Sequence, residues 1–238
     1  MEPKNLINLF VLASFTSIPS LVNALETSSI QLCSCNFIEI NGGIAQSTAL
    51  RGNTQLPAGS PIYTFGAAVG SKLLKLLAVG LEYRYIGRNS HNFGNILDNN
   101  TSISWKTQSN AALLNMSVDL INASTSIMPY LKFGIGISNN NSNNYCKVDN
   151  GVVTTTTTYD GKSKNAFAWQ AGAGFDVTVN PLFDVQLQYM YANLGKVQTG
   201  STATSVYSGG LPTTSSLSAP KTGKLQEHIG TMGIKFKF

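Results

Sequence analysis

The sequence predicts an all-β fold: an eight-stranded antiparallel transmembrane β-barrel with long extracellular loops and short periplasmic turns. Stretches in which apolar residues alternate with small or polar ones recur along the chain, at the length that a tilted membrane-spanning strand needs. The connections between these stretches are alternately long and short, as in outer-membrane barrels. Charged residues make up only 11% of the 238 residues, whereas soluble domains carry about 25%.

The N-terminus has the composition of a secretory signal peptide. Lys4 supplies a positive charge, residues 6–18 are mostly apolar, and small residues at Val22 and Ala24 occupy the positions that a signal peptidase reads. We therefore expect cleavage after Ala24. A retained helical anchor is the alternative, but the apolar run is shorter than the roughly 20 residues that a membrane-spanning helix needs. The expected divisions are a signal peptide, a short periplasmic segment and the barrel: residues 1–24, 25–35 and 36–238.

The first three predicted strands differ in how regular their alternation is. In 36–47 only the isoleucines alternate clearly with polar residues, whereas 62–73 alternates aromatic and aliphatic residues with Thr, Gly and Ala. The third strand, 77–85, is the most regular, with an apolar residue at every odd position from Leu77 to Tyr85. A half-buried soluble strand would look the same locally. The argument for a barrel therefore rests on the recurrence of the pattern over eight segments.

The next two predicted strands follow the same rule with opposite parity. In 111–121 the apolar residues occupy the even positions from Leu114 to Leu120, and in 128–138 they occupy the odd positions from Leu131 onward. The intervening positions are small, polar or charged. Because successive side chains of a strand point to opposite faces, each segment has one face for lipid and one for the lumen.

The last three predicted strands lie in the C-terminal third of the chain. Strand 165–179 is separated from 182–194 only by Asn180-Pro181, which is a tight-turn signal. Strand 228–238 has apolar residues at the even positions from Met232 onward. We expect this last strand to pair with the first, because a barrel in lipid leaves no open strand edge.

The two longest connections are rich in Asn, Ser and Thr. The third predicted loop contains Asn139 to Asn141 and the run Thr154 to Thr158, and the fourth is Ser/Thr-rich from Thr199 to Ser218. This composition is compatible with mobile, water-exposed hairpins. The two loops are either water-exposed connections without a binding role or a surface that contacts host molecules or lipopolysaccharide.

Nine charged residues fall on the predicted lumen faces. A narrow eight-stranded barrel has room for side chains and little else, so mutual pairing is favoured over selectivity charges that line a channel. The predicted lumen charge network consists of Glu39, Glu82, Arg84, Asp119, Lys132, Asp176, Asp184, Lys235 and Lys237.

Signals for catalysis or for a cofactor are weak. His91 lies in a predicted outer loop beside Ser90 and near Asp98, but a solvated loop histidine is favoured over a catalytic one. His228 is expected at the rim of the last strand. The sequence contains no phosphate-binding loop, metal-site spacing or nucleophile elbow, so we expect no enzyme activity and no cofactor.

The cysteines and the net charge argue against a zinc site and against a nucleic-acid partner. Cys33, Cys35 and Cys146 lack the spacing of a zinc site, and an odd number of cysteines leaves one unpaired in an oxidising compartment; their redox state stays open. The net charge is +5, but no cluster of Lys and Arg is present. Nucleic acid is therefore not an expected partner.

The chain resembles a known family over most of its length after the expected signal peptide, and the segments that carry the resemblance lie in the C-terminal half. The resemblance rests on residues 165–170 (NAFAWQ) with Gly172 and Gly174, on Leu187-Gln188-Tyr189-Met190-Tyr191, on Leu194-Gly195-Lys196 and on residues 228–238. These segments resemble the opacity-type, OmpA-like small outer-membrane β-barrel surface proteins, which include rickettsial adhesins. The Cys33/Cys35 pair and the Thr-rich third loop depart from that pattern.

The resemblance implies a location, partners and a function. It implies an outer-membrane protein in contact with outer-membrane lipids and lipopolysaccharide, with Phe236 and Phe238 as the C-terminal signal for the barrel assembly machinery. It further implies a non-enzymatic surface protein whose extracellular loops act either as an adhesin or as an envelope-contact structure. As an adhesin, the protein would have host-cell surface molecules as partners. A small porin for ions or small solutes is the first alternative, and a rim enzyme centred on His91 is the second.

Overall fold

The computed structural model describes residues 35–52, 57–94, 101–120, 126–209 and 213–238. Its strands are β1 (Cys35–Ser47), β2 (Arg51–Gly52), β3 (Ile62–Lys72), β4 (Leu77–Gly94), β5 (Thr101–Asp119), β6 (Ile127–Asn150), β7 (Thr154–Tyr159), β8 (Lys162–Asn180), β9 (Phe183–Gln198), β10 (Thr202–Tyr207), β11 (Thr214–Leu217) and β12 (Thr222–Lys237). The expected signal peptide, its cleavage site at Ala24, and Cys33 lie outside the described residues. Among the described residues, no helix has the length and apolarity that crossing a membrane requires.

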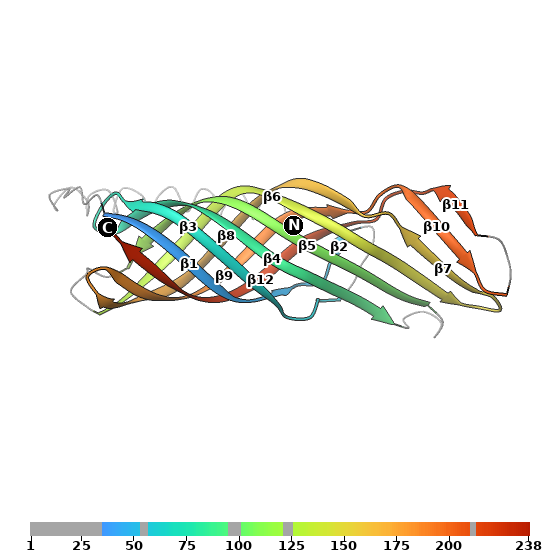
Figure 1. The fold of residues 1–238 in the computed structure, drawn as a ribbon, viewed down its shortest axis with the longest axis horizontal. Helices are drawn as coiled ribbons and strands as arrows, with labels where there is room; N and C mark the ends of the chain where they lie inside the picture. The colour runs from blue at the N-terminus through green and yellow to red at the C-terminus, as the bar shows by residue number, and fades with distance from the viewer. Residues whose placement is uncertain (1–34, 53–56, 95–100, 121–125, 210–212) are drawn as a thin grey trace, which may run out of the picture.

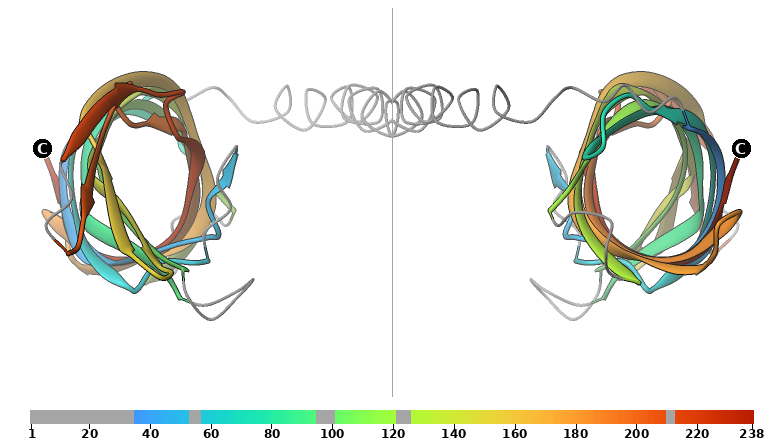
Figure 2. Two further views of the ribbon diagram at one scale, coloured as in Figure 1. Left: turned by 90° about the vertical axis from the view of Figure 1, so that its right-hand side faces the viewer. Right: turned by 90° about the vertical axis from the view of Figure 1, so that its left-hand side faces the viewer.

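Antiparallel pairing closes the long strands into a ring. The pairs run from β1 through β3, β4, β5 and β6 to β8, and then through β9 and β12 back to β1. The closing pair of β1 and β12 is continuous from Phe37 opposite Lys237 to Ser47 opposite Glu227. The strands are tilted to the long axis of the molecule (Figure 1), and the end views look into the ring (Figure 2).

Side chains alternate between the two faces of the ring wall. Ile40, Leu81 and Ile135 point outward with 57–58% of their surface exposed, whereas the neighbouring Glu39 and Glu82 point inward and are buried. The alternation follows from the period of two of an extended strand. The outer surface of the ring is therefore apolar and its interior is polar in this part, as the sequence predicted.

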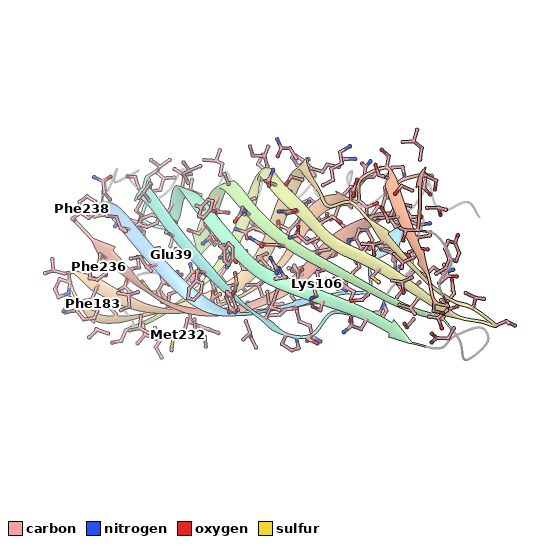
Figure 3. All side chains as sticks on the ribbon, turned by 45° about the vertical axis from the view of Figure 1, so that its right-hand side comes forward. Glu39, Lys106, Phe183, Met232, Phe236 and Phe238 are labelled. Atoms are coloured by element: carbon pink, nitrogen blue, oxygen red, sulfur yellow. The ribbon has the colours of Figure 1, made fainter. Side chains whose placement is uncertain are left out.

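Short turns join strands at the end of the ring where the chain terminates. Between β8 and β9, the Asn180 side-chain oxygen accepts hydrogen bonds from the backbone N–H groups of Leu182 and Phe183, at 2.8 and 3.0 Å. This is the turn that Asn180-Pro181 predicted. Phe183, Phe236 and Phe238 lie at this end, and Lys106 lies toward the other (Figure 3).

Several strands extend much further than the sequence predicted. β4 continues to Gly94, β5 begins at Thr101, and β6 runs to Asn150, so the expected strand ends at residues 85, 111 and 138 are wrong. The pairing of β5 with β6 carries the ladder through the Asn139 to Asn141 segment without a loop. Past the apolar surface, the outward face of a strand is polar, and the alternation that defines a lipid-facing strand disappears while the backbone ladder continues.

The third and fourth loops form β-sheet, which corrects the expectation of mobile hairpins. The threonine run forms β7, and the Ser/Thr-rich segment forms β10 and β11, in the order β6, β7, β10, β11. Threonine is β-branched and fits a pleated, half-exposed surface, which explains why the run adopts a strand. These strands lie at the end of the molecule opposite the C-terminus (Figure 1).

A bulge in β9 depends on one glycine. Gly195 has a φ of +77°, and its N–H donates to the Asn193 side-chain oxygen at 2.9 Å. The register between β9 and β12 shifts at Leu225, next to this glycine. Only glycine adopts this conformation at little cost.

We predict that Gly195→Ala lowers the free energy of unfolding by about 1 to 3 kcal/mol, because alanine is strained at positive φ. Its methyl group would also lie 2.6 Å from the Ala166 Cβ atom and 2.8 Å from the Phe167 carbonyl oxygen. Urea unfolding of the refolded protein measures the effect. Gly230→Ala is the control, because nothing lies within 4 Å of its added methyl group. Equal losses for both variants would contradict the assignment.

Candidate functional site

The centre of the ring interior is a charged network around Glu82. Arg84 forms an ion pair with Glu82, and its Nε donates to Glu82 Oε1 at 2.7 Å. Asn115 and Gln170 donate to Oε2 at 2.6 and 3.1 Å, and Lys132 Nζ lies 3.0 Å from the same oxygen. All five side chains are buried. They come from β4, β5, β6 and β8, so the network bridges several sides of the ring.

Lys132 connects this network to a second carboxylate. Its Nζ lies 3.3 Å from Glu39 Oε1, and that oxygen also accepts hydrogen bonds from Asn41 at 2.8 Å and Gln188 at 3.5 Å. Glu39 is on β1, almost diametrically across the strand order from Lys132 on β6. A single lysine therefore contacts two buried carboxylates and joins opposite walls, while Arg84 supplies the second cation of the network.

Three further ion pairs lie toward the C-terminal end of the interior. They are Asp176 with Lys235, Asp184 with Lys237 at 2.6 Å, and Asp119 with Lys72 at 2.7 Å. Each of the nine predicted lumen charges thus takes part in an ion pair. Lys72 was not predicted, because it lies at the end of β3, where the alternation gives no signal. The interior retains a cavity of about 20 Å³ beside Glu39 and Lys132, which is room for about one water molecule.

Toward β7 and β10 the interior is filled by a buried apolar cluster, which we call the apolar plug. The rings of Trp105 and Tyr145 are packed edge to face at 5.6 Å, and those of Tyr145 and Tyr159 at 5.2 Å. The indole N–H of Trp105 donates to Ser142 Oγ at 2.8 Å. The remaining members are Ala45, Leu50, Ile86, Ala111, Leu113, Ala168, Met190, Ala192, Leu194, Val197, Ala203, Leu225 and Ile229.

The sequence analysis missed the apolar plug. Trp105, Tyr145, Tyr159 and Ala203 fall in segments that were predicted to be loops. In these segments the apolar residues point inward rather than outward, so a search for a lipid-facing stripe does not find them. A search for apolar residues alternating on the lumen face, as at Ile103 and Trp105, would have found part of the cluster.

His91 is not a solvated loop residue, which corrects the prediction. It lies in β4, is fully buried, and its Nδ1 donates to the Pro57 carbonyl oxygen at 3.1 Å. Burial lowers the pKa of His91. Ser90 points to the other side of the strand, and Asp98 lies outside the described residues. The buried imidazole therefore has a structural contact where the rim-enzyme alternative requires an accessible base.

The other candidate residues lie apart from one another. His228 is exposed on the outer surface, where its Nδ1 lies 2.5 Å from the hydroxyl group of Tyr189. Cys146 lies on β6 with a free thiol, and Cys35 begins β1. Within the described ranges, no group of three His, Cys, Asp or Glu residues is arranged to hold a metal ion.

Comparison with known proteins identifies related sequences and folds. The family model of the outer membrane protein beta-barrel domain matches residues 36–213. A 75-residue segment is 37% identical to the outer membrane protein PagN of Salmonella typhimurium; the match covers 31% of this chain and 30% of PagN. The chain therefore matches less than a third of the length of this relative.

Two solved structures align with most of the chain at low sequence identity. Neisserial surface protein A is 13% identical, with a TM-score of 0.44 over 85% of this chain and 97% of that protein. The outer membrane protein OprG of Pseudomonas aeruginosa is 14% identical, with a TM-score of 0.46 over 88% of this chain and 99% of that protein.

We predict that Lys132→Met lowers the free energy of unfolding by about 3 to 5 kcal/mol, because it leaves the buried Glu39 carboxylate without a cation while Glu82 keeps Arg84. Lys147→Met is the matched control: it breaks an ion pair with Asp149 in which both side chains are about 40% exposed. Such pairs contribute about 0 to 1 kcal/mol. Urea titration of both variants measures the difference, and a loss below 1 kcal/mol for Lys132→Met would show that the network does not hold the ring together.

Proposed function

The chain belongs to the outer membrane protein beta-barrel domain family and is located in the outer membrane, and on this premise we propose that it is a non-conducting, non-enzymatic surface protein. In this proposal β1, β3, β4, β5, β6, β8, β9 and β12 form an eight-stranded transmembrane barrel. The end that carries β7, β10 and β11 faces outward and acts as an adhesin or envelope-contact surface. The short turns face the periplasm.

Two groups of exposed aromatic residues support the proposed position of the membrane along the barrel. Tyr63, Tyr83 and Tyr189 lie on the outer surface toward β7 and β10, each more than half exposed. Phe183 and Phe236 lie at the C-terminal end, with ring centroids 6.2 Å apart. Aromatic residues flank the lipid-facing band at both interfaces of outer-membrane barrels, so these groups bracket the proposed hydrocarbon region.

The proposal that the barrel does not conduct ions rests on its filled interior. The charged network spans the ring at Glu82, and the apolar plug follows it toward the outer end. A pore needs a continuous water-filled path, whereas an ion would have to pass a layer of paired charges and then a cluster of packed apolar side chains. These two layers support a surface role over the porin alternative.

The outer end offers a contact surface built from paired strands. Val152, Val206 and Leu217 are exposed there by 108%, 48% and 87%. They lie on or beside a sheet that is anchored to the plug through Tyr159 and Ala203. Exposed apolar residues on an ordered sheet bind a partner without the entropic cost of ordering a loop.

We predict that the protein reconstituted in planar bilayers gives no stepwise conductance, because the plug and the network occupy its interior. A porin reconstituted in the same preparation is the positive control. Steady ohmic steps from the parent protein would favour the porin alternative.

We predict that the triple variant Val152→Asp, Val206→Asp and Leu217→Asp folds normally but loses any binding of the parent to host cells. The three side chains are exposed, so their replacement leaves the interior unchanged. Heat-modifiability in gel electrophoresis checks folding, and a cell-binding assay checks function.

A charge-matched control replaces three exposed residues at the same end that lie outside the β7, β10 and β11 sheet: Ser60→Asp, Asn92→Asp and Gly94→Asp. This control is expected to bind like the parent. Unchanged binding by the Val152, Val206 and Leu217 variant would place the contact surface elsewhere.

A further inference from the structure

Three cationic side chains stand directly opposite one another on adjacent strands. Arg51 of β2 pairs with Lys224 of β12, and Lys224 pairs with Lys196 of β9. We call these residues the cationic row. Adjacent strands are about 4.8 Å apart, so the row spans about 10 Å of the surface. All three side chains are exposed on the outer face of the wall.

The cationic row is not neutralised by the protein. Within the described part of the chain, none of its three residues forms an ion pair with a carboxylate. Like charges directly opposite each other across strands are destabilising. An anionic partner that binds the row would offset this repulsion, and a partner with more than one anionic group would fit its width.

The surface between the row and the proposed hydrocarbon region changes character step by step. Going down β9 and β12 on the same face, the next opposed pair is Asn193 with Gln226, followed by Tyr191 with His228. The Tyr191 and His228 rings are packed edge to face at 5.4 Å, and the His228 and Tyr189 rings are stacked at 6.1 Å.

Below the aromatic level the same face becomes aliphatic. Leu187 is opposite Met232, and both side chains are more than half exposed. The order from the outer end toward the periplasmic end is therefore cations, amides, aromatic rings and aliphatic side chains. This is the order of phosphate, sugar and acyl chain in a phosphorylated glycolipid of the outer leaflet.

We propose that this face of β2, β12 and β9 binds the headgroup of such a glycolipid, the lipid A part of lipopolysaccharide. The cationic row binds its phosphates, the amides and aromatic rings contact its sugars, and the aliphatic side chains contact its acyl chains. The site rests on the membrane orientation of the proposed function. A phospholipid has a phosphate but no sugar, and it would leave the amide level and part of the row without a partner.

The test titrates the refolded full-length protein in detergent with diphosphorylated lipid A and follows the complex by native mass spectrometry. The variant Arg51→Gln, Lys196→Gln and Lys224→Gln is expected to bind about 100-fold more weakly, since each cation near an anionic lipid surface contributes about a factor of five. Dephosphorylated lipid A is expected to bind the parent as weakly as diphosphorylated lipid A binds this variant. Inorganic phosphate is not expected to compete, because it lacks the sugar and acyl contacts.

A control variant removes the same charge elsewhere on the outer half: Arg88→Gln, Lys106→Gln and Lys162→Gln. It is expected to bind lipid A within about twofold of the parent if the row, rather than net charge, determines binding. An equal loss for both variants, or no loss for the cationic-row variant, would overturn the proposal. Binding of a sulfated polysaccharide through the row, with no affinity for lipid A, would also overturn it.

Thermal unfolding gives a second readout that a purely structural role would not produce. Without lipid A, removing the opposed charges is expected to raise the melting temperature relative to the parent; with lipid A, the order is expected to reverse. The same order in both conditions would contradict the proposal. Conductance or cell binding, which test the proposed function, do not depend on the row, so the two proposals fail separately.

Discussion

The pairing of β1 with β12 is the constraint on which the rest of the structure depends. In hydrocarbon, backbone N–H and C=O groups have no water to bind, so an open strand edge is excluded. The continuous ladder between the first and last long strands removes that edge. The register of each pair matters in the same way, because a shift by one residue would exchange the apolar and polar faces of a strand.

Closure into a small ring determines the chemistry of the interior. The interior has room for side chains but little room for water, so a buried charge is stabilised by a partner of opposite charge. Lys132 on β6 meets Glu39 on β1 and Glu82 on β4, and these contacts tie together walls that share no backbone hydrogen bonds. Toward the outer end, apolar side chains join buried polar ones in the interior, and the rings of Trp105, Tyr145 and Tyr159 pack there edge to face. The barrel is thus filled by ionic pairing in one layer and by hydrophobic packing in the next.

The sequence was sufficient to predict which side chains face outward and which face inward in the part of the structure that faces lipid. Leu81 and Ile135 face outward and Glu82 and Lys132 face inward, as expected, because lipid imposes a strict apolar period of two. The sequence was insufficient to distinguish strand from loop at the outer end, where water contacts the outward face. There, polar residues such as Asn139 are compatible with strand or loop, and only tertiary pairing decides.

The same physical reason explains the errors in the candidate site. The lumen charges could be predicted from alternation, but their partners could not, because Lys72 is paired with Asp119 through tertiary proximity rather than sequence spacing. His91 was expected in a loop because the part of β4 beyond Tyr85, which contains it, lacks a lipid-facing stripe. The cationic row could not be predicted from the sequence for a further reason. Its residues Arg51, Lys196 and Lys224 are far apart in the sequence, and only the register of β2, β12 and β9 brings them together.

The outer end of the molecule is an extension of the barrel built from paired strands rather than a set of mobile loops. Amide hydrogen exchange of the folded protein in lipid nanodiscs, followed by mass spectrometry, measures this difference. Peptides from 101–110, 139–150, 154–159 and 202–207 are expected to exchange far more slowly than an unfolded chain, because their backbone N–H groups are held in the ladder. Exchange at the rate of an unfolded peptide in these segments, with protection confined to the lipid-facing parts of the strands, would contradict it.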